Sequence, residues 1–150
     1  MNSLIGEYEC KLDTKGRFLM PSNLRKQLPE ELQGEFVINK GLDQCLVLFP
    51  IPVWEAELAR LKAKSPYVKK NRTFLRVFLN GAMKVALDGS SRVLVPKRLM
   101  EYAKLEKEMV LVAQIDRVEI WDKAAYESIM DDPGFELEDL AEEVMGEENE

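Results

Sequence analysis

The 150-residue sequence contains no histidine and only two cysteines, Cys10 and Cys45. Without histidine, the chain lacks the most frequent general base and the commonest metal ligand, so a Ser-His-Asp or Cys-His hydrolase is excluded. Two widely spaced thiols are too few for a structural zinc site. We expect both cysteines to be small buried hydrophobic residues rather than a disulfide, and we expect no metal and no cofactor.

Long apolar segments are also missing. No run approaches the roughly 18 residues that a transmembrane helix requires. The first residues, Met1 to Ile5, lack the basic-then-apolar form of a signal peptide. The composition, 46% hydrophobic and 32% charged, is typical of a soluble globular protein. We therefore expect a cytoplasmic protein with no membrane partner.

Basic residues are absent from the last twenty positions, 131–150, which contain ten acids. Residues 1–130 keep the other 17 of the 27 acids together with all 21 bases, a net charge of +4. A mildly basic body with a strongly acidic tail indicates nucleic-acid contact by the body. The role of the tail stays open: it is a solubilising end, a competitor for the DNA-binding face, or a segment that docks on a neighbouring subunit.

What the chain does have is a pattern that occurs twice. Asp13-Thr14-Lys15-Gly16-Arg17 is followed by three mostly apolar residues and Pro21, and each key residue recurs 75 positions later, as Asp88, Arg92 and Pro96. Each copy predicts strand, aspartate turn, strand, proline-led helix, strand, turn, strand and helix. The expected strands are 6–12, 17–20, 35–39, 45–49, 83–87, 92–95, 109–114 and 118–121.

The duplication predicts the architecture. One copy of some 60 residues would bury too little surface to be stable by itself. Two copies can interleave their hairpins around one core, and closing the strands removes exposed edges. We expect an α+β fold, an intrachain swapped-hairpin β-barrel with flanking short helices. Its expected parts are a first repeat at 5–60, a basic helical connector at 61–80, a second repeat at 81–130 and an acidic tail at 131–150.

The connector is unusually basic. No acid lies between Leu58 and Leu87, whereas the segment carries Arg60, Lys62, Lys64, Lys69, Lys70, Arg72, Arg76 and Lys84. Three interpretations stay open: a solvated helix face, a phosphate-contacting patch, or a subunit interface that meets an acidic neighbour. Helical spacing predicts that Phe74, Leu75, Phe78 and Leu79 face inward. We also expect Trp54 and Trp121 in the core.

The aspartate and arginine of each copy flank a tight turn, so their side chains can pair across it. One interpretation is that this pair only fastens the hairpin, to which an exposed ion pair contributes about 0–1 kcal/mol. The other is that the aspartate orients an outward arginine, whose planar donors suit a guanine edge or a phosphate. Because two such arginines on one face can grip a backbone that one cannot, the repetition favours the second interpretation.

These turns, with Pro21, Pro96 and the segment 118–121, make the chain resemble the MraZ family from about Ile5 to Met130. The resemblance implies two AbrB-like (SpoVT-AbrB) motifs in a bacterial DNA-binding transcriptional regulator of the division and cell-wall gene cluster. It also implies a ring-like homo-oligomer that is nucleoid-associated. Our own hypothesis is that this oligomer binds repeated promoter boxes in double-stranded DNA and acts as a repressor. The DNA-binding residues that the resemblance implies are Asp13, Lys15, Arg17, Asp88 and Arg92.

The second copy departs from the fuller pattern, since Ser90 and Ser91 stand where the first copy has Lys15 and Gly16. The main alternative function is an antitoxin-like or structural barrel that binds another protein. An enzyme that uses Asp13 and Asp88 would lack a nucleophile–base pair and a phosphate-cradling glycine loop. We therefore expect no catalysis and no small-molecule substrate.

Overall fold

The computed structural model describes residues 2–146 and contains two series of matching elements. The first series is β1 (Leu4–Lys11), β2 (Arg17–Leu19), α1 (Ser22–Arg25), the 3-10 helix η1 (Glu30–Leu32), β3 (Glu35–Lys40), β4 (Leu46–Pro50) and α2 (Ile51–Lys62). After α3 (Lys69–Leu79), the second series is β5 (Met83–Ala86), β6 (Arg92–Leu94), α4 (Lys97–Tyr102), β7 (Glu108–Ile115), β8 (Arg117–Asp122) and α5 (Lys123–Asp131). The chain then forms α6 (Leu137–Gly146). The expected strands are all present, with ends shifted by a few residues.

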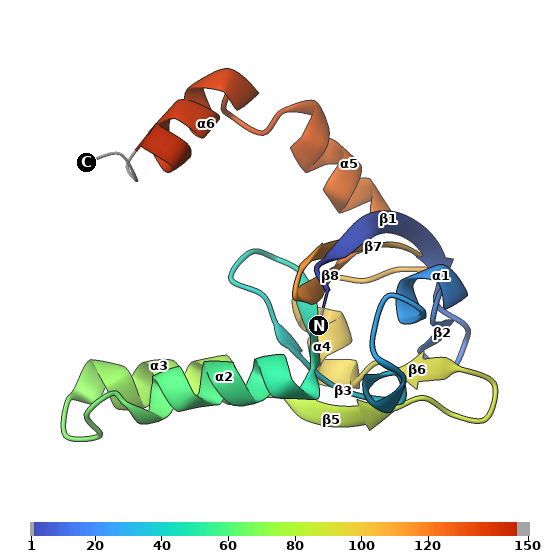
Figure 1. Ribbon diagram of the computed structural model, residues 1–150, viewed down its shortest axis with the longest axis horizontal. Coiled ribbons are helices and arrows are strands. Elements are labelled where there is room, and N and C mark those ends of the chain that lie inside the picture. The colour runs from blue at the N-terminus through green and yellow to red at the C-terminus, as the bar shows by residue number, and fades with distance from the viewer. Residues whose placement is uncertain (1, 147–150) are drawn as a thin grey trace.

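The strands form an antiparallel sheet in the order β1-β7-β8-β4-β3-β5 and a separate two-stranded ribbon, β2-β6 (Figure 1). If every strand is exchanged for its counterpart in the other repeat, the same strand order is obtained, read from the opposite edge of the sheet. The sheet therefore has a two-fold pattern that relates the two repeats. The pairs β1–β7, β3–β5, β4–β8 and β2–β6 each join the two repeats. Neither repeat can therefore complete its sheet without the other.

Equivalent hydrogen bonds occur in both halves. The Leu12 amide donates to the Lys107 carbonyl at 2.8 Å, and the Leu87 amide donates to the Gly34 carbonyl at 2.9 Å. These bonds hold the strand before each aspartate turn against the opposite repeat. The interleaving that the duplication predicts is thus present at the level of individual backbone bonds.

Closure into a barrel is not confirmed. Strands β1 and β5 form the two edges of the six-stranded sheet. The three-residue strands β2 and β6 bond to each other in the separate ribbon instead of joining these edges. The observed fold is an α+β arrangement with an open antiparallel sheet and short helices.

Two groups of apolar side chains hold the sheet and the helices together. The larger group contains Phe18 and Val93 of the ribbon together with residues from both repeats. The smaller group lies under α2 and includes Trp54. Trp54 and Trp121 are 8% and 5% exposed, so the expectation that both belong to the core is confirmed.

Helices α2 and α3 form a hairpin that projects from the body (Figure 1). We call it the α2–α3 hairpin. The sequence-based expectation that Phe74 and Leu75 face inward is wrong, because their side chains are 48% and 38% exposed. Phe78 and Leu79 pack against the group around Trp54. Only the end of α3 near the sheet has something to be buried against, and the rest of its apolar face lies beyond the body.

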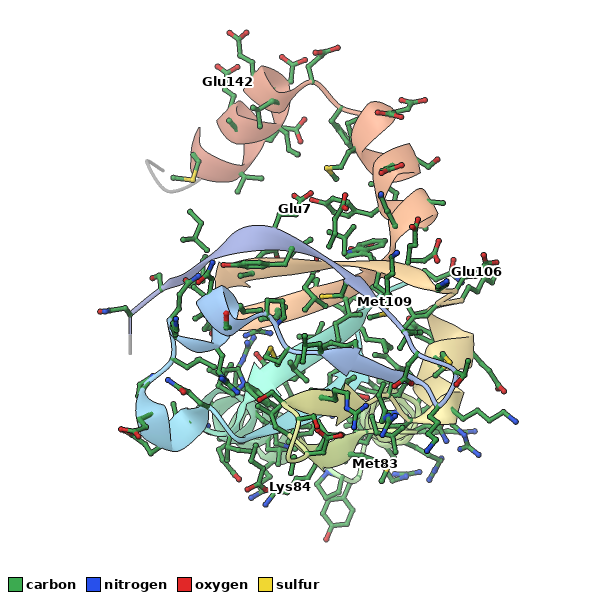
Figure 2. The ribbon with its side chains drawn as sticks, turned by 90° about the vertical axis from the view of Figure 1, so that its right-hand side faces the viewer. Glu7, Met83, Lys84, Glu106, Met109 and Glu142 are labelled. Carbon is green, nitrogen blue, oxygen red and sulfur yellow. The ribbon has the colours of Figure 1, made fainter. Side chains whose placement is uncertain are left out.

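The C-terminal helices leave the body at another side (Figure 1). Tyr126 of α5 donates a hydrogen bond to the Glu7 carboxylate of β1 at 3.0 Å, near the Glu7 label in Figure 2. Residues 137–145 of α6 are all exposed. Within residues 2–146, no helix is both long and apolar enough to cross a membrane.

The two cysteines are free thiols. Cys45 is buried and Cys10 is half-buried, and burial raises the pKa of Cys45 to about 12 and the pKa of Cys10 to about 11. Because the thiolate is the reactive form, the raised pKa values lower the reactivity of both thiols at neutral pH.

Candidate nucleic-acid interface

The first aspartate turn is held by three hydrogen bonds to one carboxylate. Oδ1 of Asp13 accepts from the backbone amides of Lys15 and Arg17, both at 2.9 Å, and Oδ2 accepts from Nε of Arg17 at 2.9 Å. An aspartate that binds backbone two residues ahead forms an Asx turn. Gly16 completes the turn with φ of +81°, a conformation that glycine adopts without strain. The aspartate therefore shapes the loop and orients the arginine at the same time.

The second turn repeats this geometry despite its different sequence. Oδ1 of Asp88 accepts from the amides of Ser90 and Arg92 at 2.8 and 3.0 Å, and Oδ2 accepts from Nε of Arg92 at 3.1 Å. Ser91 stands in the place of Gly16 and has φ of +62°. A side chain in this region costs about 1–2 kcal/mol, so the turn tolerates serine at some cost in stability.

Both carboxylates are held in the charged form. The Arg17 backbone amide is the largest cause that keeps the pKa of Asp13 below its ordinary value, and the Arg17 guanidinium and the Lys15 amide act in the same direction. For Asp88 the Arg92 backbone amide is likewise the largest cause that lowers the pKa. At neutral pH each turn thus keeps a carboxylate beside its arginine.

The ribbon brings the two arginines together. Arg17 of β2 lies opposite Leu94 of β6, Phe18 lies opposite Val93, and Leu19 lies opposite Arg92. Because side chains alternate along a strand, both arginines lie on one face of the ribbon, and the buried central pair lies on the other. Arg17 and Arg92 are diagonal neighbours, a relation that spans roughly 7–8 Å between backbones.

Each guanidinium is held by a hydrogen bond at Nε, whereas its two terminal nitrogens are not held by any described residue. The aspartate binds Nε, and within residues 2–146 no further hydrogen bond to the guanidinium of Arg17 or Arg92 is found. The side chains of Arg17 and Arg92 are 24% and 34% exposed. A guanidinium oriented in this way presents its terminal donors to a planar acceptor pair, as in a guanine edge or a phosphate.

The same face carries two leucines that the sequence analysis did not identify. Leu19 and Leu94 are 60% and 55% exposed, although each lies next to a fully buried core residue. The signal was present in the sequence: once Phe18 and Val93 are assigned to the core, strict alternation places their neighbours outward. The outward face of the ribbon, made of Arg17, Leu19, Arg92 and Leu94, is called the ribbon face below.

Arg25 is a second residue that the sequence analysis missed. Its Nη1 donates to the Ser91 hydroxyl at 2.7 Å, so a base from α1 of the first repeat supports the turn of the second. The counterpart of Arg25 in the other repeat is Met100, whose methyl group lies over Gly16. The contact joins residues far apart in the sequence, so no local sequence pattern predicts it.

Lys15 is exposed and lies beside a shallow groove whose lining also includes Lys97 and Lys107. Its counterpart Ser90 carries no charge, so the two ends of the ribbon face differ in electrostatic potential. The eight bases from Arg60 to Lys84 do not join this site. The α2–α3 hairpin, which carries most of them, extends from the side of the molecule opposite the ribbon (Figure 1).

Comparison with known proteins finds the same duplication and identifies the family. The family model described as "MraZ protein, putative antitoxin-like" matches the chain twice, at residues 4–77 and 78–146. A protein from Christiangramia forsetii named "Transcriptional regulator MraZ" is 46% identical over 97% of this chain and 95% of its own length. Proteins of the same name from Flavobacterium psychrophilum and a Thermoanaerobacter species are 42% and 38% identical, over 99% and 94% of this chain and 96% of each relative. A match of this extent in both repeats means that the chain belongs to the MraZ family.

Proposed function

We propose that this protein is a sequence-specific DNA-binding transcriptional regulator that represses the division and cell-wall gene cluster from repeated promoter boxes. The relatives' name, transcriptional regulator, supports the general class. The regulator would act in the cytoplasm at the nucleoid, without catalysis. The observation that carries the proposal is the placement of Arg17 and Arg92 on one outward face of a single two-stranded ribbon.

The dimensions of DNA support this role for the ribbon face. The major groove is about 12 Å wide and admits a two-stranded β-ribbon. In the proposed complex the ends of Arg17 and Arg92 read base edges, and Asp13 and Asp88 hold them in position. Lys15 and its neighbours contact phosphates, which set the position of the protein on the duplex but carry no sequence information.

A single ribbon face is small, so affinity in this proposal comes from repetition. Several subunits in a ring-like homo-oligomer engage several boxes at once, and linkage between sites raises the effective concentration of each. The interleaved repeats support the further assignment of an AbrB-like swapped-hairpin arrangement. The division into 5–60, 61–80, 81–130 and 131–150 belongs to the same proposal.

The decisive experiment titrates the protein onto a duplex from upstream of its own gene and onto a scrambled duplex of equal length. Replacing a base-reading arginine costs about 1–3 kcal/mol and relaxes preference at the contacted position. We expect Arg17→Ala and Arg92→Ala each to weaken binding to the specific duplex by that amount. The scrambled duplex, which lacks the base contacts, is expected to lose less.

Arg60→Ala is the matched control. Arg60 is also an arginine, its side chain is 80% exposed, and it lies on α2 away from the ribbon. Its replacement is expected to leave specific binding of one isolated box unchanged. Equal losses for Arg60 and Arg17, or no loss for either ribbon arginine, would show that the site is assigned to the wrong face.

The alternative function is antitoxin-like binding of another protein. Two observations favour it: the wording of the family description and the exposure of Leu19 and Leu94, since apolar side chains suit a protein partner. The same titration separates the two functions. A protein-binding barrel would show no preference for the upstream duplex over the scrambled one.

A further inference from the structure

Helix α6 is amphipathic, and its residues 137–145 are all exposed within the described part of the chain, residues 2–146. Its apolar residues follow helical spacing, as Leu137, Leu140, Ala141, Val144 and Met145, and they lie on one side. Glu138, Asp139, Glu142 and Glu143 occupy the other side, and none of the four forms an ion pair within residues 2–146. Leu137, Val144 and Met145 are 83%, 57% and 60% exposed. An unpartnered stripe of this kind marks a surface that another surface is expected to cover.

The α2–α3 hairpin carries a surface of opposite character. A groove along it has an apolar floor formed by Leu61, Phe74 and Leu75. Its rim contains Lys62, Lys64, Lys70 and Arg72, and no acid is among the described residues that line it. All eight bases from Arg60 to Lys84 are exposed, and within residues 2–146 only Arg60 and Lys84 face an acid, each at 3.8 Å. We call this groove, with its four-base rim, the hairpin groove.

The two surfaces complement each other in charge, and both are apolar at their centre. A helix that lays an apolar stripe into an apolar groove is a common mode of recognition. α6 carries four acids, of which Glu138 and Glu143 border its stripe, and four bases line the hairpin groove. Ten residues of helix span about 15 Å, a length that fits along part of an eleven- or twelve-residue helix. Phe74 and Leu75, which the body leaves uncovered, would then be buried.

Within one chain the two surfaces lie apart. In Figure 1 the C-terminal helices lie at the top and the α2–α3 hairpin at the bottom, with open space between α6 and the hairpin. In Figure 2, Glu142 lies at the end of the molecule opposite Lys84, which follows the hairpin. The hydrogen bond between Tyr126 and Glu7 holds α5 against β1, at the top of the body.

We propose that α6 of one subunit docks in the hairpin groove of a neighbouring subunit. Such a contact is heterologous, because it joins two different surfaces, and contacts of this kind generate a closed ring when the rotation between subunits closes. The inference deepens the oligomeric part of the proposed function by identifying the contact that builds the oligomer. It does not depend on DNA binding by the ribbon face.

The test is a charge exchange in the full-length protein, without DNA. Glu142→Lys with Glu143→Lys reverses two charges on the tail, and Lys64→Glu with Lys70→Glu reverses two on the groove. Because like charges at an interface are strongly unfavourable, each pair is expected to raise the subunit dissociation constant at least about tenfold. Combining all four changes in one chain is expected to restore association. Sedimentation velocity and native mass spectrometry measure both results.

Mixing separates docking between subunits from docking within one chain. The tail variant keeps an intact groove, and the groove variant keeps an intact tail. Mixed in equal amounts, the two are expected to form mixed oligomers, because the native tail of one variant meets the native groove of the other and the two charge-reversed surfaces also match, whereas each by itself associates weakly. Docking within a chain would give no mixed oligomer, and that result would overturn the inference.

Lys26→Glu with Lys97→Glu is the matched control, since it reverses two exposed bases outside the hairpin. This pair is expected to leave the oligomer mass unchanged, and circular dichroism checks that every variant is folded. Unchanged mass for the tail and groove variants would also refute the inference. If the groove variant instead lost affinity for a single DNA box while keeping its mass, the hairpin would be a phosphate-contacting surface.

Discussion

At the scale of single residues, the aspartate of each turn does more than balance a charge. One carboxylate accepts two backbone amides and one guanidinium nitrogen, and the arrangement is the same in both repeats. The turn therefore has a defined shape before any ligand arrives. An arginine that is already oriented loses less conformational freedom on binding, which favours affinity.

The two glycines in these turns, Gly16 and Gly89, differ in backbone conformation and in the space around them. Gly16 has φ of +81°, and a Cβ there would lie 2.8 Å from Cε of Met100. Gly89 is not in the left-handed region, and a Cβ there would meet nothing within 4 Å. We expect Gly16→Ala to lower the free energy of unfolding by about 1–2 kcal/mol, because alanine is strained at positive φ.

Gly89→Ala is the matched comparison. It restricts the unfolded chain without straining the folded one, an effect that stabilises by about 0.4–1 kcal/mol. Urea unfolding of the two variants measures both values. Equal destabilisation by the two alanines would mean that backbone conformation does not distinguish these positions.

At the scale of elements, the ribbon combines charged and apolar side chains on one face. Leu19 and Leu94 alternate with the arginines across the two strands. In the major groove, apolar side chains contact the C5-methyl group of thymine. If the ribbon reads DNA, its leucines have a natural partner there, and the arginines alone would not account for the whole specificity.

This role for the leucines leads to a prediction that removes a methyl group from the DNA instead of the protein. Replacing thymine by deoxyuridine in the specific duplex is expected to weaken wild-type binding by about 0.8 kcal/mol for each contacted methyl group. Leu19→Asn with Leu94→Asn is expected to weaken binding to the thymine duplex and to be insensitive to the replacement. A wild-type protein that binds both duplexes equally would exclude these contacts.

The α2–α3 hairpin shows where element-level reasoning from sequence fails. The apolar spacing of residues 68–79 predicts a helix, and α3 is present. The same spacing also predicts an inward apolar face, but it contains no information on how far the sheet extends under the helix. Phe78 reaches the sheet and Phe74 does not, so a single stripe is buried at one end and exposed at the other.

At the scale of the whole molecule, four strand pairs join the two repeats. The larger group of apolar side chains also contains residues from both repeats. A structure in which neither half has a complete sheet is expected to unfold as one unit. The chain has two tryptophans that report on different halves, Trp54 in the first and Trp121 in the second. Both are buried and therefore sensitive to unfolding.

Single-tryptophan variants test this cooperativity. Trp54→Phe and Trp121→Phe each leave one fluorescent reporter, and we expect both reporters to show the same loss of structure when a common core residue is changed. Phe18→Ala, which removes a 1% exposed side chain, is expected to lower the stability seen by either tryptophan by about 3–5 kcal/mol. Coincident transitions by different probes are the criterion for two-state unfolding. A loss seen by Trp54 alone would show that the repeats unfold separately.

The sequence by itself determined the duplication, the strands and the two aspartate–arginine turns. Each of these depends on residues close together in the chain, where spacing, turn chemistry and alternation act directly. It also separated an acidic tail from a basic body, because charge counts require no coordinates. The pairing of Asp13 with Arg17, and of Asp88 with Arg92, follows from the same short range.

Only the tertiary structure decided which strands pair, and that the sheet is open rather than closed. It placed Arg17 and Arg92 on one ribbon face, brought Arg25 to the Ser91 hydroxyl, and left Phe74 uncovered. All of these are contacts, or missing contacts, between segments distant in the chain. Their geometry depends on how two interleaved repeats fill a common core, and a local pattern does not contain that information.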